Sequence, residues 1–274
     1  MADAVNDFGI LPRSASTGIQ SIEIGTALLR ALAESDGPLT LTALAGAVGM
    51  PPGKAHKYLA SFIRNGLVAQ HEAGGRYDLG PFALELGFSA IGRMAVMDLA
   101  QVALDNLRDQ LGTTVSMAIW TPRGPTIARW AETPHMISLV IRLGTVMPLL
   151  TSAFGRIFAA FLDRRLTEDI IRQELSDPSG LAAHAGLRSL ADVDALMAEF
   201  RARRMAFAED LAAPRRTALA APVFDRDHRM VAAIAVIAIQ GRFDASWDST
   251  AAEKLALGAN TLSRHLGARP EPIA

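Results

Sequence analysis

Residues 41–66 read LTALAGAVGMPPGKAHKYLASFIRNG, and this stretch decides the fold of the N-terminal part of the chain. Three small residues, Ala45, Gly49 and Ala55, stand at the fifth, ninth and fifteenth places of a window that begins at Leu41. Small side chains at these places let two helices cross closely, and a glycine supplies the turn between them. The stretch therefore predicts a helix-turn-helix whose second helix begins at the proline pair.

The flanking residues predict a further helix and a hairpin around this motif. A helical apolar pattern runs over residues 19–32, and Thr40 or Thr42 is placed to cap the next helix. Within residues 67–79, two short β-like runs enclose a turn that is rich in glycine. Three helices followed by a hairpin make a winged helix, which we expect over residues 19–80.

The remainder of the chain predicts a long helix and then an alternation of strands and helices. Residues 81–111 are helical in pattern, interrupted only by Gly87 and Gly92, and can connect the two halves of the chain. Strand patterns follow at 115–120, 126–130, 137–143, 219–224 and 231–239, and helix patterns at 155–163, 167–175, 189–203 and 248–266. The expected fold class is α+β with two domains: a flexible leader (1–18), a winged helix-turn-helix (19–80), a linker helix (81–96) and an α/β domain with an antiparallel sheet (97–274).

The composition favours a folded cytoplasmic protein. Half of the 274 residues are apolar, a fifth are charged and none is cysteine, so disulfides and thiolate metal sites are excluded. The N-terminus does not resemble a secretory signal, and the longest apolar run, residues 230–239, is shorter than the roughly 18 residues that a membrane span needs. The six histidines show no metal-binding spacing, so we expect neither a metal nor a cofactor.

The second helix of the motif carries the residues that we expect to contact DNA. The net charge of −1 does not by itself indicate a nucleic-acid partner. Residues 54–64, however, hold three basic residues and no acid, and this helix is the one that enters the major groove in a helix-turn-helix. Two alternatives stay open, because a basic helix face can simply be solvated and Arg76 can be an ordinary surface arginine. The candidate DNA-binding residues are Thr42, Gly53, Lys54, His56, Lys57, Arg64 and Arg76.

Several short motifs follow one another in an order and spacing that are typical of one family. They are Ile19-Gln20-Ser21-Ile22-Glu23, Leu39 to Met50, Gly75 to Gly80, Glu85-Leu86-Gly87, Arg142-Leu143-Gly144, Pro148, Ser152 to Gly155 and Ala220 to Asp225. Together they resemble the IclR family of bacterial regulators over roughly residues 19–267. The resemblance implies a winged helix, a linker helix, a GAF-like effector-binding domain, and dimers or tetramers that bind palindromic operators.

Two departures from the family pattern concern specificity. The recognition helix of the family usually opens with a Lys-Ser-Thr-like run, whereas this chain has Pro52-Gly53-Lys54, so a relative's operator is not transferable. Family members that bind small oxoacids have polar residues where this chain has Ala208, Ala218, Ala235 and Ile237, and the family's glycine and two acids are missing at Arg204, Ala208 and Leu211. Because unpaired polar groups are costly to bury, a pocket without them favours an apolar or aromatic effector.

The effector site is expected around residues 151–155, which precede a helix. A helix N-terminus offers unpaired N–H groups and the positive end of its dipole, which can hold a carboxylate or a hydroxyl group. Thr151 or Ser152 can instead be only an N-cap, and the aromatic residues can be simple core. The candidate effector-binding residues are Met117, Trp120, Trp130, Leu143, Leu149, Thr151, Ser152, Ala153, Phe154, Gly155, Ala208, Ala218, Ala235 and Ile237.

These patterns predict a transcription regulator of a catabolic operon, a homodimer or tetramer that binds double-stranded operator DNA and a small-molecule effector. Two alternatives remain. An enzyme on the C-terminal domain would use His135, Asp163 or Glu209 as acid or base, although no nucleophile–base pair and no phosphate loop marks one. A sensor module that acts through protein contacts without binding DNA would fit the Pro-Gly opening and the neutral charge.

Overall fold

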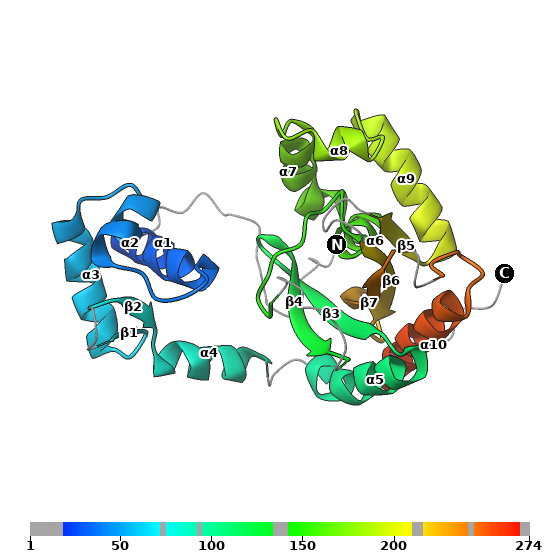
Figure 1. Cartoon of the computed structure of the whole chain (residues 1–274), viewed down its shortest axis with the longest axis horizontal. Coiled ribbons are helices and arrows are strands. Elements are labelled where there is room, and N and C mark those ends of the chain that lie inside the picture. The colour runs from blue at the N-terminus through cyan, green and yellow to red at the C-terminus, as the bar shows by residue number, and fades with distance from the viewer. Residues whose placement is uncertain are drawn as a thin grey trace. The chain divides into compact units, whose positions relative to one another are not determined.

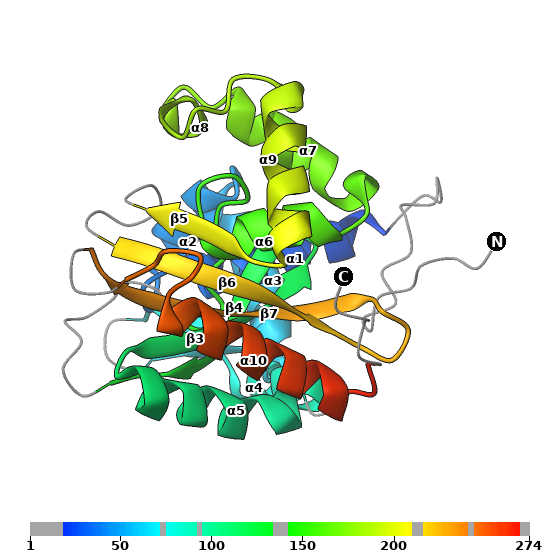
Figure 2. The same ribbon diagram turned by 90° about the vertical axis from the view of Figure 1, so that its right-hand side faces the viewer.

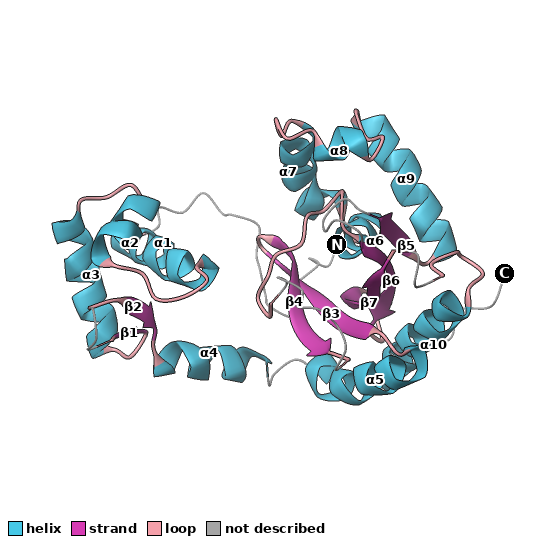
Figure 3. Cartoon of the chain, in the orientation of Figure 1, coloured by secondary structure: helices cyan, strands magenta, loops and turns pink. Residues whose placement is uncertain are grey.

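The computed structural model describes residues 19–71, 75–91, 95–133, 142–209, 216–240 and 244–268. These belong to two compact units, residues 1–94 and residues 95–274, and each unit has a hydrophobic core of its own. Figure 1 follows the chain from end to end, and Figure 3 marks its helices and strands.

The first unit is a winged helix-turn-helix, as the sequence predicts. Its helices are α1 (Gln20–Glu34), α2 (Leu41–Ala47) and α3 (Pro52–Arg64), and its hairpin pairs β1 (Val68–Gln70) with β2 (Tyr77–Leu79). The core of this unit gathers side chains from all three helices and both strands, among them Leu28, Leu32, Leu44, Leu59, Val68 and Tyr77.

Small residues let α2 and α3 cross, and this part of the prediction is confirmed. Ala45 is 1% exposed and Ala55 is fully buried, so neither position has room for a larger side chain. Gly49 has a φ of +66°, a left-handed conformation that glycine adopts without strain. Thr40, rather than Thr42, caps α2 by accepting the N–H of Ala43 at 3.2 Å.

Residues 81–91 and 95–111 are helical, as the pattern predicts, and residues 92–94 lie outside the described ranges. Helix α4 (Pro81–Ile91) belongs to the first unit and α5 (Ala95–Leu111) to the second.

The second unit is a five-stranded antiparallel sheet with helices on both faces. The strands in spatial order are β4 (Gly124–Ala131), β3 (Thr114–Thr121), β7 (Met230–Ile239), β6 (Arg216–Phe224) and β5 (Ala206–Glu209). Figure 2 shows α5 and α10 (Thr250–His265) side by side on one face, and α6 (Ala153–Phe161) packs on the other face. Helix α9 (Leu190–Arg203) packs on α6, next to α7 (Arg164–Leu175) and the short α8 (Leu181–His184).

Two elements of this unit were not predicted. Strand β5 and helix α8 span four residues each, which is too short for a periodic apolar pattern to stand out. The strand predicted over residues 137–143 lies mostly outside the described residues, and Leu143 and Gly144 form a turn. The other predicted strands and helices are confirmed, with small shifts at their ends.

Candidate functional site

Helix α3 presents a basic face to solvent. Ala55 and Leu59 are fully buried on its inner side. At about 100° per residue, Lys57 and Arg64 fall on the opposite side of the helix. The predicted DNA-binding residues of this helix are all exposed, and they are Gly53, Lys54, His56, Lys57 and Arg64. A second molecule that approaches α3 from outside therefore meets these residues first.

The other two predicted DNA contacts are also exposed, but one of them is engaged within the unit. Thr42 lies on the surface of α2. The Nη1 atom of Arg76 donates a hydrogen bond to the carbonyl oxygen of Pro38 at 3.4 Å. This bond ties the hairpin to the connection between α1 and α2.

The packing of the described residues of the first unit does not require glycine at position 53. A Cβ built at this position has no atom within 4 Å, and the φ of Gly53 is not in the left-handed region. The same holds for Gly46 on the surface of α2. A glycine inside a helix destabilises it by roughly 0.5–1 kcal/mol relative to alanine. The space that Gly53 leaves open is thus available to a molecule outside the unit.

In the second unit, the sheet face toward α6 brings together the predicted effector residues of the last three strands. Directly opposed residues of an antiparallel sheet point to the same face. Ala218 is opposed by Ala208 on one side and by Ile237 on the other, and Ser116 is opposed by Ala235 and Trp130. We call this set the α6-side patch, and it consists of Ser116, Trp130, Ala208, Ala218, Ala235 and Ile237.

Polar atoms on this face lack partners. Thr114 and Ser116 are fully buried, and neither their hydroxyl oxygens nor the Nε1 of Trp130 makes a hydrogen bond with another described residue. Thr114 opposes Ile237, so its side chain faces the α6-side patch as well. A buried polar group without a partner costs about 1–3 kcal/mol, which favours a bound molecule that pairs these atoms.

The sequence analysis missed Thr114 and Ser116. The signal was present, because they are polar residues at alternate positions near the start of a strand that is apolar from Met117 to Trp120. Ala208, Ala218, Ala235 and Ile237 supply no polar side chain to this face, whereas β3 supplies two hydroxyl groups to it.

The predicted effector residues Met117 and Leu143 lie away from the sheet face that carries the α6-side patch. Met117 alternates with Ser116 and opposes Ile234 and Arg129, so its side chain points to the face that α5 and α10 cover. Leu143 is 64% exposed and lies in a turn. Trp120, in contrast, shares the face of Ser116 and packs on Phe158 of α6, with 5.7 Å between the ring centroids.

Side chains hold the segment that leads into α6. Ser152 is the N-cap, because its Oγ accepts the N–H of Gly155 at 2.9 Å and donates to the carbonyl of Pro148 at 2.6 Å. The carboxylate of Glu174 accepts the N–H groups of Leu149 and Leu150 at 2.6 and 2.8 Å. The N–H groups of the two residues that follow the cap, Ala153 and Phe154, make no hydrogen bond with another described residue. These two donors remain available to a ligand.

Thr151 has a different role from Ser152. It is 2% exposed, its hydroxyl has no partner among the described residues, and it lines a cavity of about 340 Å³ beside α7 and α8. Glu174 and Asp177 line the same cavity. Burial raises the pKa of Glu174 above its ordinary value, although the N–H groups of Leu149 and Leu150 oppose this shift, and hydrogen bonds from Ser179 lower the pKa of Asp177.

The residues considered for catalysis have structural partners or lie outside the described residues. Asp163 caps α7 by accepting the N–H of Arg165, Glu209 accepts a hydrogen bond from Gln240, and His135 is outside the described ranges. Among the described residues, no three histidine, aspartate or glutamate side chains are placed to hold a metal ion. Within the same ranges, we find no helix with the length and apolar character needed to cross a membrane.

Comparisons with known proteins match both units. The model of the bacterial transcriptional regulator IclR C-terminal domain matches residues 88–264, and that of the IclR helix-turn-helix domain matches residues 21–72. The glycerol operon regulatory protein of Streptomyces griseus is 30% identical over 220 residues, which are 80% of this chain and 84% of that protein.

Solved structures show the same similarity. The crystal structure of Pseudomonas aeruginosa HmgR is 34% identical with a TM-score of 0.58, and the match covers 92% of this chain and 100% of that one. An IclR homologue from Microbacterium hydrocarbonoxydans, crystallised with 4-hydroxybenzoate, is 16% identical with a TM-score of 0.71, over 90% of this chain and 98% of that one. At this level of identity the second structure shows a shared fold.

The different roles of Ser152 and Thr151 lead to a stability prediction. Ser152→Ala should lower the free energy of unfolding by about 0.5–2 kcal/mol, because α6 loses its N-cap. Thr151→Val should leave this free energy unchanged or raise it, because it removes a buried hydroxyl that has no partner. Urea unfolding followed by tryptophan fluorescence measures both, since all three tryptophans lie in the second unit. Equal losses in the two variants would contradict this division of roles.

Proposed function

Because the chain belongs to the IclR family of DNA-binding transcriptional regulators, we propose that it controls a catabolic operon and that a small aromatic effector changes its affinity for the operator. The similarity to a glycerol operon regulatory protein supports the catabolic role. The observation that carries the proposal of an aromatic effector is the α6-side patch, an apolar surface that also holds buried polar atoms without partners.

On the DNA side, α3 is the helix that enters the major groove. Lys57 and Arg64 stand at the centre of its exposed face, and no acidic residue of α3 opposes them. Gly53 lies in the first turn of the same helix, where a missing side chain lets the helix backbone approach the DNA closely. Close approach to DNA would explain why this exposed position holds glycine, which the packing of the described residues does not explain.

We further propose that the chain binds DNA as a homodimer, with α4 at the contact between two copies. Leu84 and Phe88 lie four residues apart on one side of this helix, and they are 58% and 65% exposed. An exposed apolar surface of this kind marks an interaction site in a soluble protein. A second copy of α4 would cover it and bring two recognition helices to one operator.

In the second unit, we propose that the effector binds between the α6-side patch and the start of α6. An aromatic ring would pack on Ala218 and Ala235, while Ser116 and Trp130 offer hydrogen bonds to a polar substituent. A carboxylate would accept the available N–H groups at the start of α6. The homologue crystallised with 4-hydroxybenzoate supports a compound of this type, with one ring, one hydroxyl and one carboxylate.

The first prediction concerns phosphate contacts. In a dimer, Lys57→Ala removes one cation from each recognition helix, so the slope of log affinity against log salt concentration should fall by roughly 2. Lys254→Ala in the second unit is the matched control and should leave the slope unchanged. Mobility-shift titrations of the upstream intergenic region at several salt concentrations measure the slope. A fall of about 1 would point to a single recognition helix on the DNA and would contradict the dimer.

The second prediction concerns Gly53. Gly53→Ala should stabilise the chain by about 0.5–1 kcal/mol, because alanine is the better helix former, and should weaken operator binding at least tenfold. Gly46→Ala, at an equally open position of α2, should stabilise the chain by a similar amount without weakening operator binding. Thermal unfolding and mobility-shift titration measure the two effects. If both variants bind the operator equally well, the helix backbone does not come close to DNA at Gly53.

The third prediction concerns the effector. By isothermal titration, 4-hydroxybenzoate should bind at least tenfold more tightly than pyruvate or glyoxylate, a difference of about 1.4 kcal/mol that ring burial can supply. Ser116→Ala should weaken 4-hydroxybenzoate and leave the stability of the free protein unchanged or higher, because the hydroxyl has no partner there. Micromolar binding of an oxoacid, with no binding of aromatic compounds, would show that the pocket takes a different class of ligand.

A further inference from the structure

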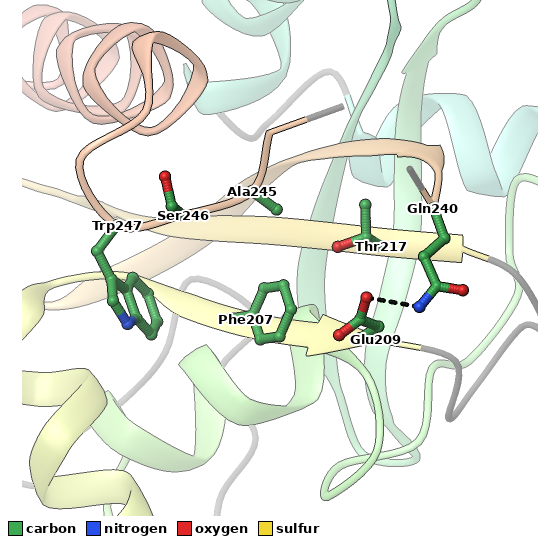
Figure 4. A pocket seen from close by; sticks show the side chains of 7 residues that line it. All are labelled: Phe207, Glu209, Thr217, Gln240, Ala245, Ser246 and Trp247. Carbon is green, nitrogen blue, oxygen red and sulfur yellow. Dashed lines mark hydrogen bonds between the residues drawn. The ribbon is translucent and has the colours of Figure 1, made fainter. Parts of the chain in front are cut away.

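A second cavity lies on the opposite side of the sheet from the α6-side patch. It has a volume of about 330 Å³. Phe207 and Glu209 alternate with Ala208 along β5, and Thr217 precedes Ala218 in β6, so their side chains point to the other face. Figure 4 shows the side chains that line this cavity, which are Phe207, Glu209, Thr217, Gln240, Ala245, Ser246 and Trp247.

Glu209 gives this cavity a negative charge. Its carboxylate accepts a hydrogen bond from the Nε2 of Gln240 at 2.7 Å, which orients it at the ends of the strands (Figure 4). The ion pairs formed among the described residues do not include Glu209. Arg203, which stacks on Trp247 at 4.8 Å, is already paired with Glu199 at 3.0 Å. The charge of Glu209 is therefore available to a ligand of opposite sign.

Aromatic rings form the opposite end of the cavity. The rings of Phe207 and Trp247 meet edge to face, with 6.2 Å between their centroids, and Trp247 also contacts Phe200. These contacts fix the indole in place. A flat ring can stack on such a surface, and a cationic group gains further attraction from the π electrons.

Thr217 is a second polar group in this cavity, independent of Glu209. The residue is 3% exposed and its hydroxyl has no hydrogen-bond partner among the described residues. Since it opposes Glu209 directly in the sheet, the hydroxyl and the carboxylate lie on neighbouring strands of the same face. A buried hydroxyl without a partner destabilises the folded protein, and a ligand or a water molecule that forms a hydrogen bond with it removes this cost.

We propose that this cavity is a second small-molecule site, which binds a single planar ring that carries an amidinium or amino group. The ring stacks against Phe207 and Trp247, and the cationic group pairs with Glu209 next to the hydroxyl of Thr217. A volume near the lower end of the range for ligand pockets fits one ring. The two faces of the sheet thus prefer ligands of opposite charge, because the proposed effector on the α6 side is an acid. This inference does not rest on the identity of that effector.

Benzamidine and benzoate are suitable probes, because they have nearly the same shape and opposite charge. In isothermal titration of the full chain, benzamidine should bind, Glu209→Gln should weaken it at least tenfold, and benzoate should not compete with it. Glu168→Gln on α7 is the matched control and should leave benzamidine binding unchanged. No binding of benzamidine, equal binding by the Glu209 variant, or competition by benzoate would each overturn the proposal.

Trp247 provides a local readout that separates this site from the effector site. Benzamidine should change the tryptophan fluorescence of the parent chain, and Trp247→Phe should abolish that change while isothermal titration still detects binding, because phenylalanine keeps an aromatic wall. Trp120 and Trp130 report the α6 side of the sheet and should not respond. A fluorescence change that persists in the Trp247 variant would place the ligand on the α6 side and overturn the proposal. Failure of 4-hydroxybenzoate to bind, in contrast, would bear on the effector proposal alone.

Discussion

The second unit depends on the close approach of the start of α6 to the backbone of Pro148 and Leu149. A Cβ at position 155 would overlap these backbone atoms, so the approach exists because residue 155 is glycine. Ser152 then pairs the carbonyl of Pro148 and the N–H of Gly155, and Glu174 of α7 pairs the N–H groups of Leu149 and Leu150. Because side chains fix both the segment and the helix that it begins, the N–H groups after the cap are held at one place beside the sheet.

Arg156 links this segment to the edge of the sheet. Its Nε donates to the carbonyl of Leu150 at 2.8 Å, and its Nη1 donates to the carbonyl of Phe207 in β5. The side chain is 7% exposed, and burial lowers its pKa to about 10. The ion pairs among the described residues do not include it. Strand β5 is at the edge of the sheet, and the buried guanidinium of Arg156 forms a hydrogen bond with a carbonyl group on it.

Local patterns were sufficient to predict the fold, and they were insufficient for the site. The small residues Ala45 and Ala55 act through contacts between adjacent helices, so the helix-turn-helix could be predicted from the sequence. The alternation of β3 predicts that Ser116 and Met117 point to opposite faces of the sheet. It does not predict which face α6 covers, because that depends on how distant segments pack in three dimensions. The sequence analysis therefore included Met117 and omitted Ser116. The hydrogen bonds of Arg156 with Phe207 and of Glu174 with Leu150 also join residues that are far apart in the sequence, so a local pattern could not predict them.

The alternation of β6 also limits how this unit can change during evolution. Thr217 and Ala218 are neighbours in the chain, yet they belong to opposite surfaces of the sheet. Inserting or deleting one residue in this strand would exchange the two surfaces along its length, so that Thr217 and the larger Leu219 and Val223 would face α6 and the alanines would face the other side. Point substitutions can adjust each surface separately, whereas a change of one residue in β6 needs a β-bulge to restore the register, as in the pairing of β6 with β7 at Val223 and Phe224. Variation in length is more easily accommodated in the connections between strands.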